Sequence, residues 1–282
     1  MKLAALRGTI LVVGAANTGK TTFARYLYHR LGAHHGRLAF VDGDMGQASL
    51  GPPTTMTLAL GGYREGGFPP GGARFRAFVG DVSPAGHMLQ TLVAAHKLVA
   101  KARAEGATAV VFDTDGMVEP ARGGGALKRA LVALLRPETV VALQRGSELE
   151  HLLVPLRRGR RTRVIDRRVE GPVRRRGSVE RRAHRAKRFQ RAFEAGRNLH
   201  VDWLSLSVVP SPSFTQHRLV AMEDEDGFVL ALGIVVDLDR SRHVVHLHTP
   251  LRSLEQVETL HVGDVAVDPH SFRDSRLTSR GC

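Results

Sequence analysis

The stretch TILVVGAANTGKTT (residues 9–22) joins a β-branched apolar run to a glycine-bearing loop and the start of a helical pattern. The loop matches GxxxxGK[ST] from Gly14 to Thr21. Its glycines let the backbone curl, so that successive N–H groups and a helix N-terminus face phosphate oxygens. The stretch therefore predicts a nucleotide-binding P-loop, against a chance match in a glycine-rich chain. The residues expected to hold the nucleotide are Gly14, Ala15, Ala16, Asn17, Thr18, Gly19, Lys20, Thr21 and Thr22.

Two side chains of this loop carry the expected chemistry. Lys20 is placed to reach the β- and γ-phosphates of the nucleotide, and the hydroxyl of Thr21 is placed to ligate Mg²⁺.

Around the loop, short β-branched runs alternate with longer helical patterns as far as residue 166. This alternation predicts βαβ units and an α/β P-loop NTPase fold, with a mostly parallel sheet flanked by helices. The expected strands are Thr9–Val13, Leu38–Asp42, Arg74–Val79, Thr108–Asp113, Thr139–Leu143 and Thr162–Ile165. The expected helices are Lys20–Leu31, Pro84–Ala104, Gly124–Leu135 and Ser147–Leu156.

The C-terminal third has a different pattern. An arginine-studded helix is expected at about 177–195, with Phe189 and Phe193 forming an apolar seam. Strand-like runs separated by turn clusters then predict a small antiparallel β module. They are Leu204–Val209, Arg218–Met222, Phe228–Val236 and His243–Leu247. We therefore divide the chain into a P-loop domain with its arginine helix (1–198) and a β-rich domain (199–282). The glycine-rich segment 61–72 is expected to be an irregular loop.

Three aspartates lie at the carboxyl ends of predicted strands. Asp42 and Asp44 lie in VDGDMGQ, and Asp113 opens DTDG, which has the DxxG shape of a Walker B motif. The carboxyl ends of parallel strands meet at the ligand crevice of an open sheet, so all three can face the phosphates. A single aspartate at a strand end is more often a turn or capping residue. Their combination with a P-loop favours a metal and catalytic role, with Asp42 and Asp113 near the metal.

The residues after the strand TVVALQ bear on nucleotide choice. A guanine-reading Asn-Lys-x-Asp motif is absent there, because the strand continues as Gln144-Arg145-Gly146-Ser147. This favours ATP, or a nucleotide bound without base selectivity, over GTP.

The 282-residue chain carries a net charge of +14, which is concentrated in one segment. Residues 157–191 hold 16 Lys and Arg against three acidic residues, so the rest of the chain is close to neutral. Such a block suits a polyanionic partner such as nucleic acid, although a solvated charged face is an alternative reading. A single terminal cysteine, Cys282, and the lack of a long apolar run lead us to expect a cytoplasmic protein.

Several motifs together resemble the polynucleotide 5′-hydroxyl kinases. They are GAANTGKTTFARYLYHRL, VDGDMGQASLGPP, FVGDVSPAGH, VVFDTDGMV, VVALQRGSELEHLL, SVERRAHRAKRFQRAF and GFVLALGIVVDLD. The resemblance runs from about residue 9 to 262, and DGDMGQ followed by GPP is its most specific part. It implies transfer of the ATP γ-phosphate, with Mg²⁺, to the 5′-hydroxyl end of RNA or DNA.

The resemblance also implies roles for individual residues. Asp44 corresponds to the general base, with Asp42 and Gln47 supporting metal and substrate. The clasp on the acceptor nucleotide corresponds to Thr114, Asp115, Gly116 and Met117, although the eukaryotic relatives have tryptophan at the last position. The lid arginines, which close over the transferring phosphate, correspond to Arg181, Arg185 and Arg188. The chain starts at the P-loop strand, so we expect no counterpart of the N-terminal β domain of the eukaryotic members.

A nucleotide-dependent scaffold of the partitioning-ATPase type is the alternative, because a D-x-D pattern also follows the second strand there. Such proteins carry an additional lysine early in the P-loop, where this chain has Ala15 and Ala16.

Overall fold

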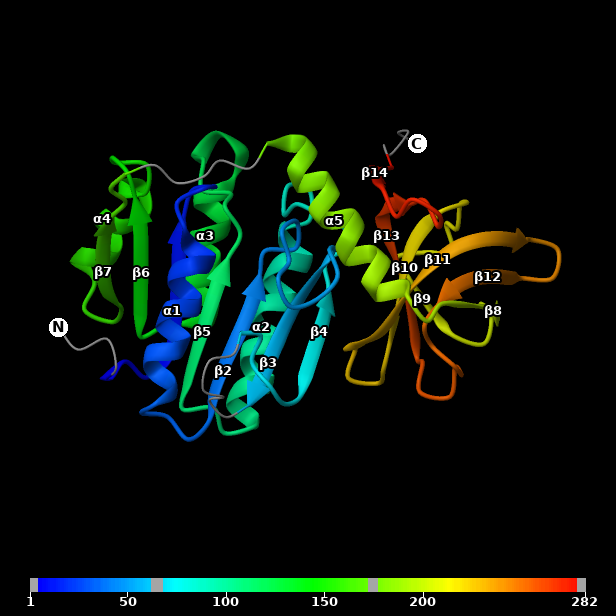
Figure 1. Cartoon of the computed structure of the whole chain (residues 1–282), viewed down its shortest axis with the longest axis horizontal. Helices are drawn as coiled ribbons and strands as arrows, with labels where there is room; N and C mark the ends of the chain where they lie inside the picture. The colour runs from blue at the N-terminus through cyan, green and yellow to red at the C-terminus, as the bar shows by residue number, and fades with distance from the viewer. Residues whose placement is uncertain (1–4, 62–67, 172–176, 278–282) are drawn as a thin grey trace. The chain divides into compact units, whose positions relative to one another are not determined.

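The computed structural model describes residues 5–61, 68–171 and 177–277 (Figure 1). Internal contacts divide the chain into two compact units. Unit 1 comprises Met1–Asp44, Met56–Phe75 and Pro84–Arg176, and unit 2 comprises Met45–Thr55, Arg76–Ser83 and Gly177–Cys282. The chain therefore passes from one unit to the other five times.

Sheet A contains the strand that leads into the P-loop. Its order is β4-β3-β2-β5-β1-β6-β7, and β1, β2, β5, β6 and β7 run parallel to their neighbours in this set. β2 and β3 are antiparallel. The strands are β1 (Gly8–Gly14), β2 (Leu38–Gly43), β3 (Thr55–Gly61), β4 (Arg74–Phe78), β5 (Ala109–Thr114), β6 (Thr139–Gln144) and β7 (Arg163–Arg168).

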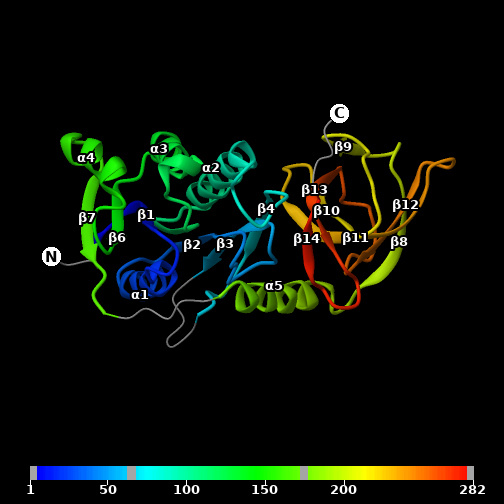
Figure 2. The same cartoon turned by 90° about the horizontal axis from the view of Figure 1, so that it is seen from above.

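Helices cover both faces of this sheet. Figure 2 shows α1 (Lys20–Gly32) on one face, and α2 (Met88–Ala104) and α3 (Gly124–Leu135) on the other. A short 3₁₀ turn (Pro120–Arg122) precedes α3, and α4 (Glu150–Arg158) precedes β7. Every residue of β2, β5 and β6 is buried, as expected for parallel strands covered on two sides. The α/β prediction is confirmed, and the carboxyl ends of β1, β2 and β5 lie at one edge.

Several elements differ from the sequence-based expectations. β3 was not expected, and it pairs with β2 and continues into the glycine-rich segment, of which residues 62–67 lie outside the described residues. α2 begins at Met88 instead of Pro84, because Gly86 has a left-handed φ of 85° that interrupts a helix. α4 begins at Glu150 instead of Ser147 and includes Pro155.

Unit 2 contains α5 (Ser178–Phe193) and the antiparallel sheet B. The sheet order is β14-β13-β10-β11-β12-β8, and β9 pairs in parallel with β13. The strands are β8 (Arg197–Asp202), β9 (Ser207–Val209), β10 (Arg218–Glu223), β11 (Val229–Asp239), β12 (Val244–Thr249), β13 (Thr259–Val267) and β14 (Asp274–Arg276). The expected strand Leu204–Val209 is wrong in its first half, where the chain turns, and β8, β13 and β14 were not expected.

The helix α5 packs on sheet B through the apolar seam expected from its sequence. Phe189 and Phe193 are buried against Leu219, Ile234 and Val265 of the sheet. A second cluster, around Trp203, Phe214 and Leu260, is built from other residues of unit 2. The domain boundary at residue 198 stays a prediction, and internal contacts group α5 with the β-rich part. Among the described helices, none has the length and apolar character needed to cross a membrane.

Candidate active site

The P-loop of unit 1 has the backbone conformation that its glycines were expected to allow. Gly19 has a left-handed φ of 82° directly before α1. A Cβ on Gly14 would lie 2.6 Å from the carbonyl oxygen of Leu143 and 2.6 Å from the Thr18 hydroxyl, so a larger residue is excluded there. Arg145, in the loop after β6, donates to the Asn17 carbonyl oxygen at 3.0 Å and braces the loop from the side.

Lys20 lies at the base of the P-loop. Its side chain is buried, and Nζ donates a hydrogen bond of 2.8 Å to the carbonyl oxygen of Ala15. Burial lowers the pKa of Lys20, and the carboxylates of Asp113 and Asp44 partly oppose that shift. An ammonium group held in this way can bind phosphate oxygens. Those oxygens would replace the water molecules that Lys20 loses on burial.

Of the three aspartates at the ends of predicted strands, Asp113 and Asp44 lie close to this lysine, and Asp42 lies beside Asp113. Asp42 of β2 and Asp113 of β5 are register partners, and both are buried. Asp44 lies near enough to act electrostatically on both Lys20 and Asp113. The structure therefore brings together the P-loop lysine and the carboxylates that the sequence had placed at separate strand ends.

Asp113 is the most perturbed of these carboxylates. Burial, reinforced by the negative charge of Asp42, raises its pKa to about 7 from the ordinary value of 3.8. The Thr21 hydroxyl lies close enough to lower this pKa somewhat, but neither carboxylate oxygen forms a well-directed hydrogen bond within the described residues. Two buried, unsatisfied oxygens of this kind are costly unless a cation or a proton compensates them.

These residues fit a magnesium ion. Mg²⁺ in nucleotide sites takes one or two carboxylates, phosphate oxygens and waters, so it does not need a cage of protein ligands. Consistent with this, no group of three His, Cys, Asp or Glu with metal-binding geometry occurs among the residues described. The orphaned oxygens of Asp113, with Thr21 beside them and Asp42 in register, are the ligands that such an ion would use.

The raised pKa of Asp113 predicts a pH-dependent effect of Asp113→Asn on stability. The Asp113 carboxyl binds a proton more tightly in the folded state than in the unfolded state. The contribution of Asp113 to the free energy of unfolding is therefore largest below about pH 4, and it is lost as pH rises through about 7. Asparagine removes the charge, so the variant without metal is expected to be more stable than the parent at pH 8, by roughly 2–4 kcal/mol.

Thermal and urea unfolding in EDTA between pH 4 and 8 measures this difference. Asp226→Asn, at an exposed position in the turn between β10 and β11, is the matched control and should show no comparable trend. A stability difference for Asp113→Asn that stays constant across this range would contradict the account.

The clasp residues 114–117 begin with the last residue of β5. The Thr114 hydroxyl donates to the Val12 carbonyl oxygen at 2.8 Å. Gly116 lies against the P-loop, since a Cβ there would be 2.9 Å from the Ala16 nitrogen. Asp115 accepts a hydrogen bond from the Met117 N–H at 2.8 Å and forms a buried ion pair with Lys128. Substrate roles for these residues stay predictions, and the Asp115 carboxylate is engaged with Lys128.

Lys128 is a site residue that sequence reasoning missed. It is fully buried on α3, between Leu127 and Leu131, and its ammonium group contacts Asp115 at 2.5 Å. Its charge also acts on Lys20. The signal was present, because a lysine on the apolar face of an amphipathic helix requires a buried partner.

In unit 2, the segment 45–55 that follows Asp44 is bound to α5 at several points. Nε2 of Gln47 donates to the Arg181 carbonyl oxygen at 3.5 Å. His184 contacts the Ala48 carbonyl oxygen at 3.0 Å, and Arg188 donates twice to that of Gly51, at 3.0 and 2.6 Å. The second half of the DGDMGQASLGPP motif is therefore attached to the arginine helix.

The three lid arginines have different surroundings. Arg185 forms a buried ion pair of 2.9 Å with Asp274 of β14, which ties α5 to sheet B. Arg188 donates to the Gly51 carbonyl oxygen, and Arg181 is a partly exposed residue. Roles in phosphoryl transfer stay predictions for all three, and Arg185 and Arg188 also have structural contacts in unit 2.

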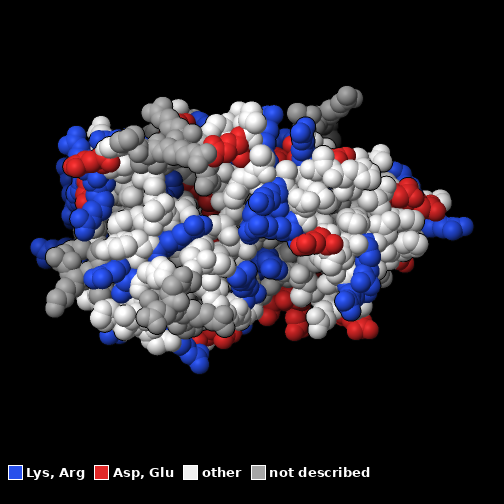
Figure 3. All heavy atoms as spheres, viewed as in Figure 1, with Lys and Arg blue, Asp and Glu red and all other residues white. Residues whose placement is uncertain are grey.

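The remaining basic residues gather where β7 and α4 lie, an edge that Figure 3 shows crowded with Lys and Arg. Arg157 pairs with Glu150 and Asp166 at 2.6 Å, whereas the side chains of Arg167 and Arg168 are exposed. Residues 174–176 of the basic block lie outside the described residues.

Comparison with curated proteins finds similar archaeal chains. A polyribonucleotide 5′-hydroxyl-kinase of Pyrococcus horikoshii is 29% identical over 67% of this chain and 50% of its own length. That of Pyrococcus furiosus is 30% identical over 66% and 50%, and that of Pyrococcus abyssi is 24% identical over 92% and 87%. The chain thus spans about half the length of the first two relatives.

Comparison with solved structures gives the same fold. A structure of the wild-type Clp1p-Pcf11p complex has a TM-score of 0.66 at 12% identity, covering 92% of this chain and 74% of that one. A second, titled for the extended interface between Pcf11p and Clp1p, has a TM-score of 0.67 at 12% identity, covering 94% and 76%. The family described as "mRNA cleavage and polyadenylation factor CLP1 P-loop" matches residues 14–195, well over half of the sequence. The chain therefore belongs to the CLP1 P-loop family.

Proposed function

We propose that this chain is an ATP-dependent polynucleotide 5′-hydroxyl kinase that transfers the γ-phosphate of ATP to the 5′-hydroxyl end of RNA, DNA or both. The relatives named as polyribonucleotide 5′-hydroxyl-kinases make RNA the first acceptor to test. The observation that carries the proposal is the position of the Asp44 carboxylate near Lys20 of an intact P-loop. A kinase needs a base beside the accepting hydroxyl, and a carboxylate close to the phosphate-binding lysine can serve as that base.

In the proposed reaction, Asp44 accepts the proton of the 5′-hydroxyl while that oxygen forms a bond with the γ-phosphorus. The bond between the γ-phosphorus and the β,γ-bridging oxygen breaks in line, and ADP leaves. Lys20 neutralises the β- and γ-phosphate oxygens during the transfer. Asp44 then returns its proton to solvent. Positioning and charge stabilisation supply most of the rate enhancement in phosphoryl transfers of this kind.

The lid role of Arg181 is supported by its hydrogen bond with Gln47, a residue that lies close in sequence to the proposed general base. Gln47 follows Asp44 by three residues, so their Cα atoms lie within about 11 Å whatever the arrangement of the units. The side chain of Gln47 in turn donates to the Arg181 carbonyl oxygen. We therefore propose that Arg181 stabilises charge on the equatorial γ-phosphate oxygens. The main role of Arg185 and Arg188 is then to hold α5 in place.

Magnesium completes the proposed site. Thr21, Asp42 and Asp113 would hold the ion, which when bound offsets negative charge on the β- and γ-phosphates. The proposal assigns Gln47 and the clasp residues 114–117 to the acceptor nucleotide.

A transfer assay tests the proposal. Purified protein, γ-labelled ATP and Mg²⁺ are incubated with RNA and DNA oligonucleotides that carry a 5′-hydroxyl, and label on the oligonucleotide is measured. We expect labelled product, and no label on the same oligonucleotides with a 5′-phosphate, because the accepting oxygen is then blocked. Removal of Mg²⁺ with EDTA should abolish transfer.

The second candidate is a nucleotide-dependent scaffold that hydrolyses ATP. The D-x-D carboxylates after β2 favour it, since they also occur in partitioning ATPases, whereas Ala15 and Ala16 at the position of the extra lysine argue against it. Release of inorganic phosphate with no labelled oligonucleotide, over all acceptors, would replace the kinase by the scaffold.

A further inference from the structure

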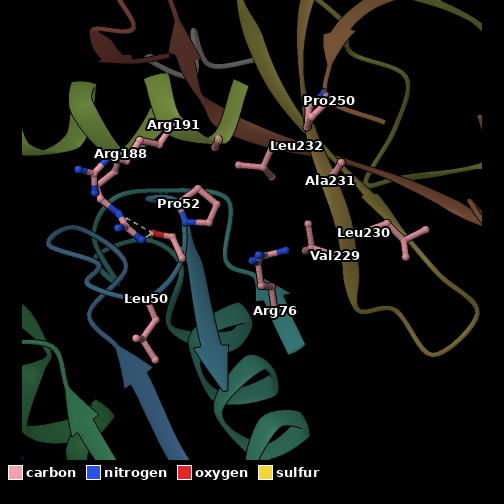
Figure 4. Close-up of a pocket in the computed structure, with 12 residues that line it drawn as sticks. Leu50, Pro52, Arg76, Arg188, Arg191, Val229, Leu230, Ala231, Leu232 and Pro250 are labelled. Carbon is pink, nitrogen blue, oxygen red and sulfur yellow. Dashed lines mark hydrogen bonds between the residues drawn. The ribbon is translucent and has the colours of Figure 1, made fainter. Parts of the chain in front are cut away.

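Unit 2 contains a pocket of about 300 Å³ that is separate from the P-loop residues (Figure 4). Its walls come from the segment 45–55, from β4, from α5 and from β11. The lining residues are Leu50, Gly51, Pro52, Arg76, Arg188, Arg191, Ala192, Val229, Leu230, Ala231, Leu232 and Pro250. The volume is at the small end for ligand sites and has room for one nucleotide-sized group.

Three arginines and no acidic residue line this pocket. Arg188 is fixed by its two hydrogen bonds to the Gly51 carbonyl oxygen, one of which is drawn in Figure 4. Arg191 lies one helical turn further along α5, is exposed, and forms no hydrogen bond or ion pair with any described residue. Guanidinium groups bind phosphate through paired N–H donors, so this concentration of positive charge suits an anionic phosphate group.

The opposite wall of the pocket is apolar. Val229 and Leu232 of β11, which pack in the same cluster as Phe189 and Phe193 of α5, line it together with Pro52 of the segment 45–55 (Figure 4). An inorganic anion would gain nothing from such a wall, whereas a flat, largely apolar ring would be desolvated against it. Positive charge on one side and apolar surface on the other match a group that combines a phosphate with an aromatic base.

We propose that this pocket binds one internal nucleotide of the polynucleotide strand, with its phosphate on Arg191 and Arg76 and its base against β11. This inference deepens the proposed kinase function and rests on it for the identity of the strand. Arg191 follows Arg181 by ten residues, which is about 15 Å along the helix axis. The pocket is thus a few nucleotides away from the proposed lid arginine, and it would hold the strand while the 5′ end reacts.

Fluorescence anisotropy with a 5′-hydroxyl octaribonucleotide, without ATP, tests the inference. Arg191→Glu is expected to weaken binding about tenfold or more, because it removes a charge-assisted phosphate contact and adds repulsion. It should also reduce the slope of log K against log salt by about one. Arg242→Glu is the matched control, since Arg242 is an exposed arginine of unit 2 outside the pocket and the change in net charge is identical.

A second variant tests the apolar side of the pocket. Ala192→Leu fills part of the space without altering the charge, so we expect weaker octamer binding with an unchanged salt slope. Circular dichroism melting of each variant establishes that it is folded. Inorganic phosphate and a nucleoside monophosphate serve as competitors, and neither is expected to displace the octamer at millimolar concentration.

Equal losses in Arg191→Glu and Arg242→Glu, or no loss in either, would overturn the inference. The inference would also be overturned if Arg191→Glu weakened binding of the free monophosphate but not of the octamer. That result would indicate that the pocket binds a free nucleotide. Because the readout is binding, it is independent of phosphoryl transfer. A protein that binds RNA through Arg191 without labelling it would contradict the proposed kinase alone.

Discussion

Asp44→Asn is expected to lower the rate of phosphate transfer to a 5′-hydroxyl oligonucleotide by about 10²–10⁴-fold, the usual contribution of a general base. Asparagine has nearly the same shape as aspartate but cannot accept the hydroxyl proton. ATP binding should change little, because Lys20 and the backbone of the P-loop remain intact. Single-turnover transfer and nucleotide binding, measured on the same preparation, separate these two effects.

The control for this variant must replace a carboxylate that lies outside the proposed active site. Asp226→Asn, in the exposed turn between β10 and β11, alters the net charge equally and should retain full transfer. If Asp44→Asn transferred phosphate at the parental rate, the general base would be another group and the mechanism proposed for this residue would be abandoned. A raised pH should not rescue the variant, since asparagine does not ionise.

Arg181→Ala is expected to lower the transfer rate by about 10³-fold, within the range for arginines that stabilise charge on a transferring phosphoryl group. Arg181 is partly exposed, and it is its backbone carbonyl oxygen that accepts from Gln47, so the substitution leaves that hydrogen bond possible. The KM for ATP should change much less than kcat. Steady-state kinetics at saturating oligonucleotide measure both.

Arg182→Ala is the neighbouring control, because Arg182 is exposed on the same turn of α5 and has no assigned role. Arg185→Ala provides a contrast. Loss of its ion pair leaves Asp274 buried without a partner, so unfolding in urea should occur at lower concentration. Comparable loss of transfer in Arg181→Ala and Arg182→Ala would indicate a general effect of charge, and the lid assignment of Arg181 would fail.

Much of unit 1 could be predicted from the sequence because its signals are local. The P-loop, the parallel strands and the helix that follows them depend on spacing within a few residues. Because parallel strands end at one edge of a sheet, the order of the motifs alone predicts that Asp42 and Asp113 lie close together. The pairing of Asp42 with Asp113 and the proximity of Asp113 to Lys20 are observed, while the roles of both carboxylates in metal binding stay predictions.

The parts that could not be predicted depend on contacts between residues far apart in the chain. β3 lies between a proline pair and a glycine-rich segment, and its pairing with β2 and β4 makes it a strand. The ion pair between Arg185 and Asp274 spans 89 residues, and the contact between Arg188 and Gly51 spans 137. Their spacing on the helix predicts that Arg181, Arg185 and Arg188 share a face. It does not predict that Arg185 and Arg188 form contacts within unit 2.

The five passages of the chain between the two units have a consequence for protein engineering. A fragment cut at residue 176 or 198 would separate α5 or sheet B from the segments 45–55 and 76–83, which lie near the N-terminus in sequence and belong to the same unit. Phe78, for example, would lose the sheet residues it packs against. Chimeras with archaeal relatives therefore need at least three exchanged segments, and a single junction should yield insoluble protein.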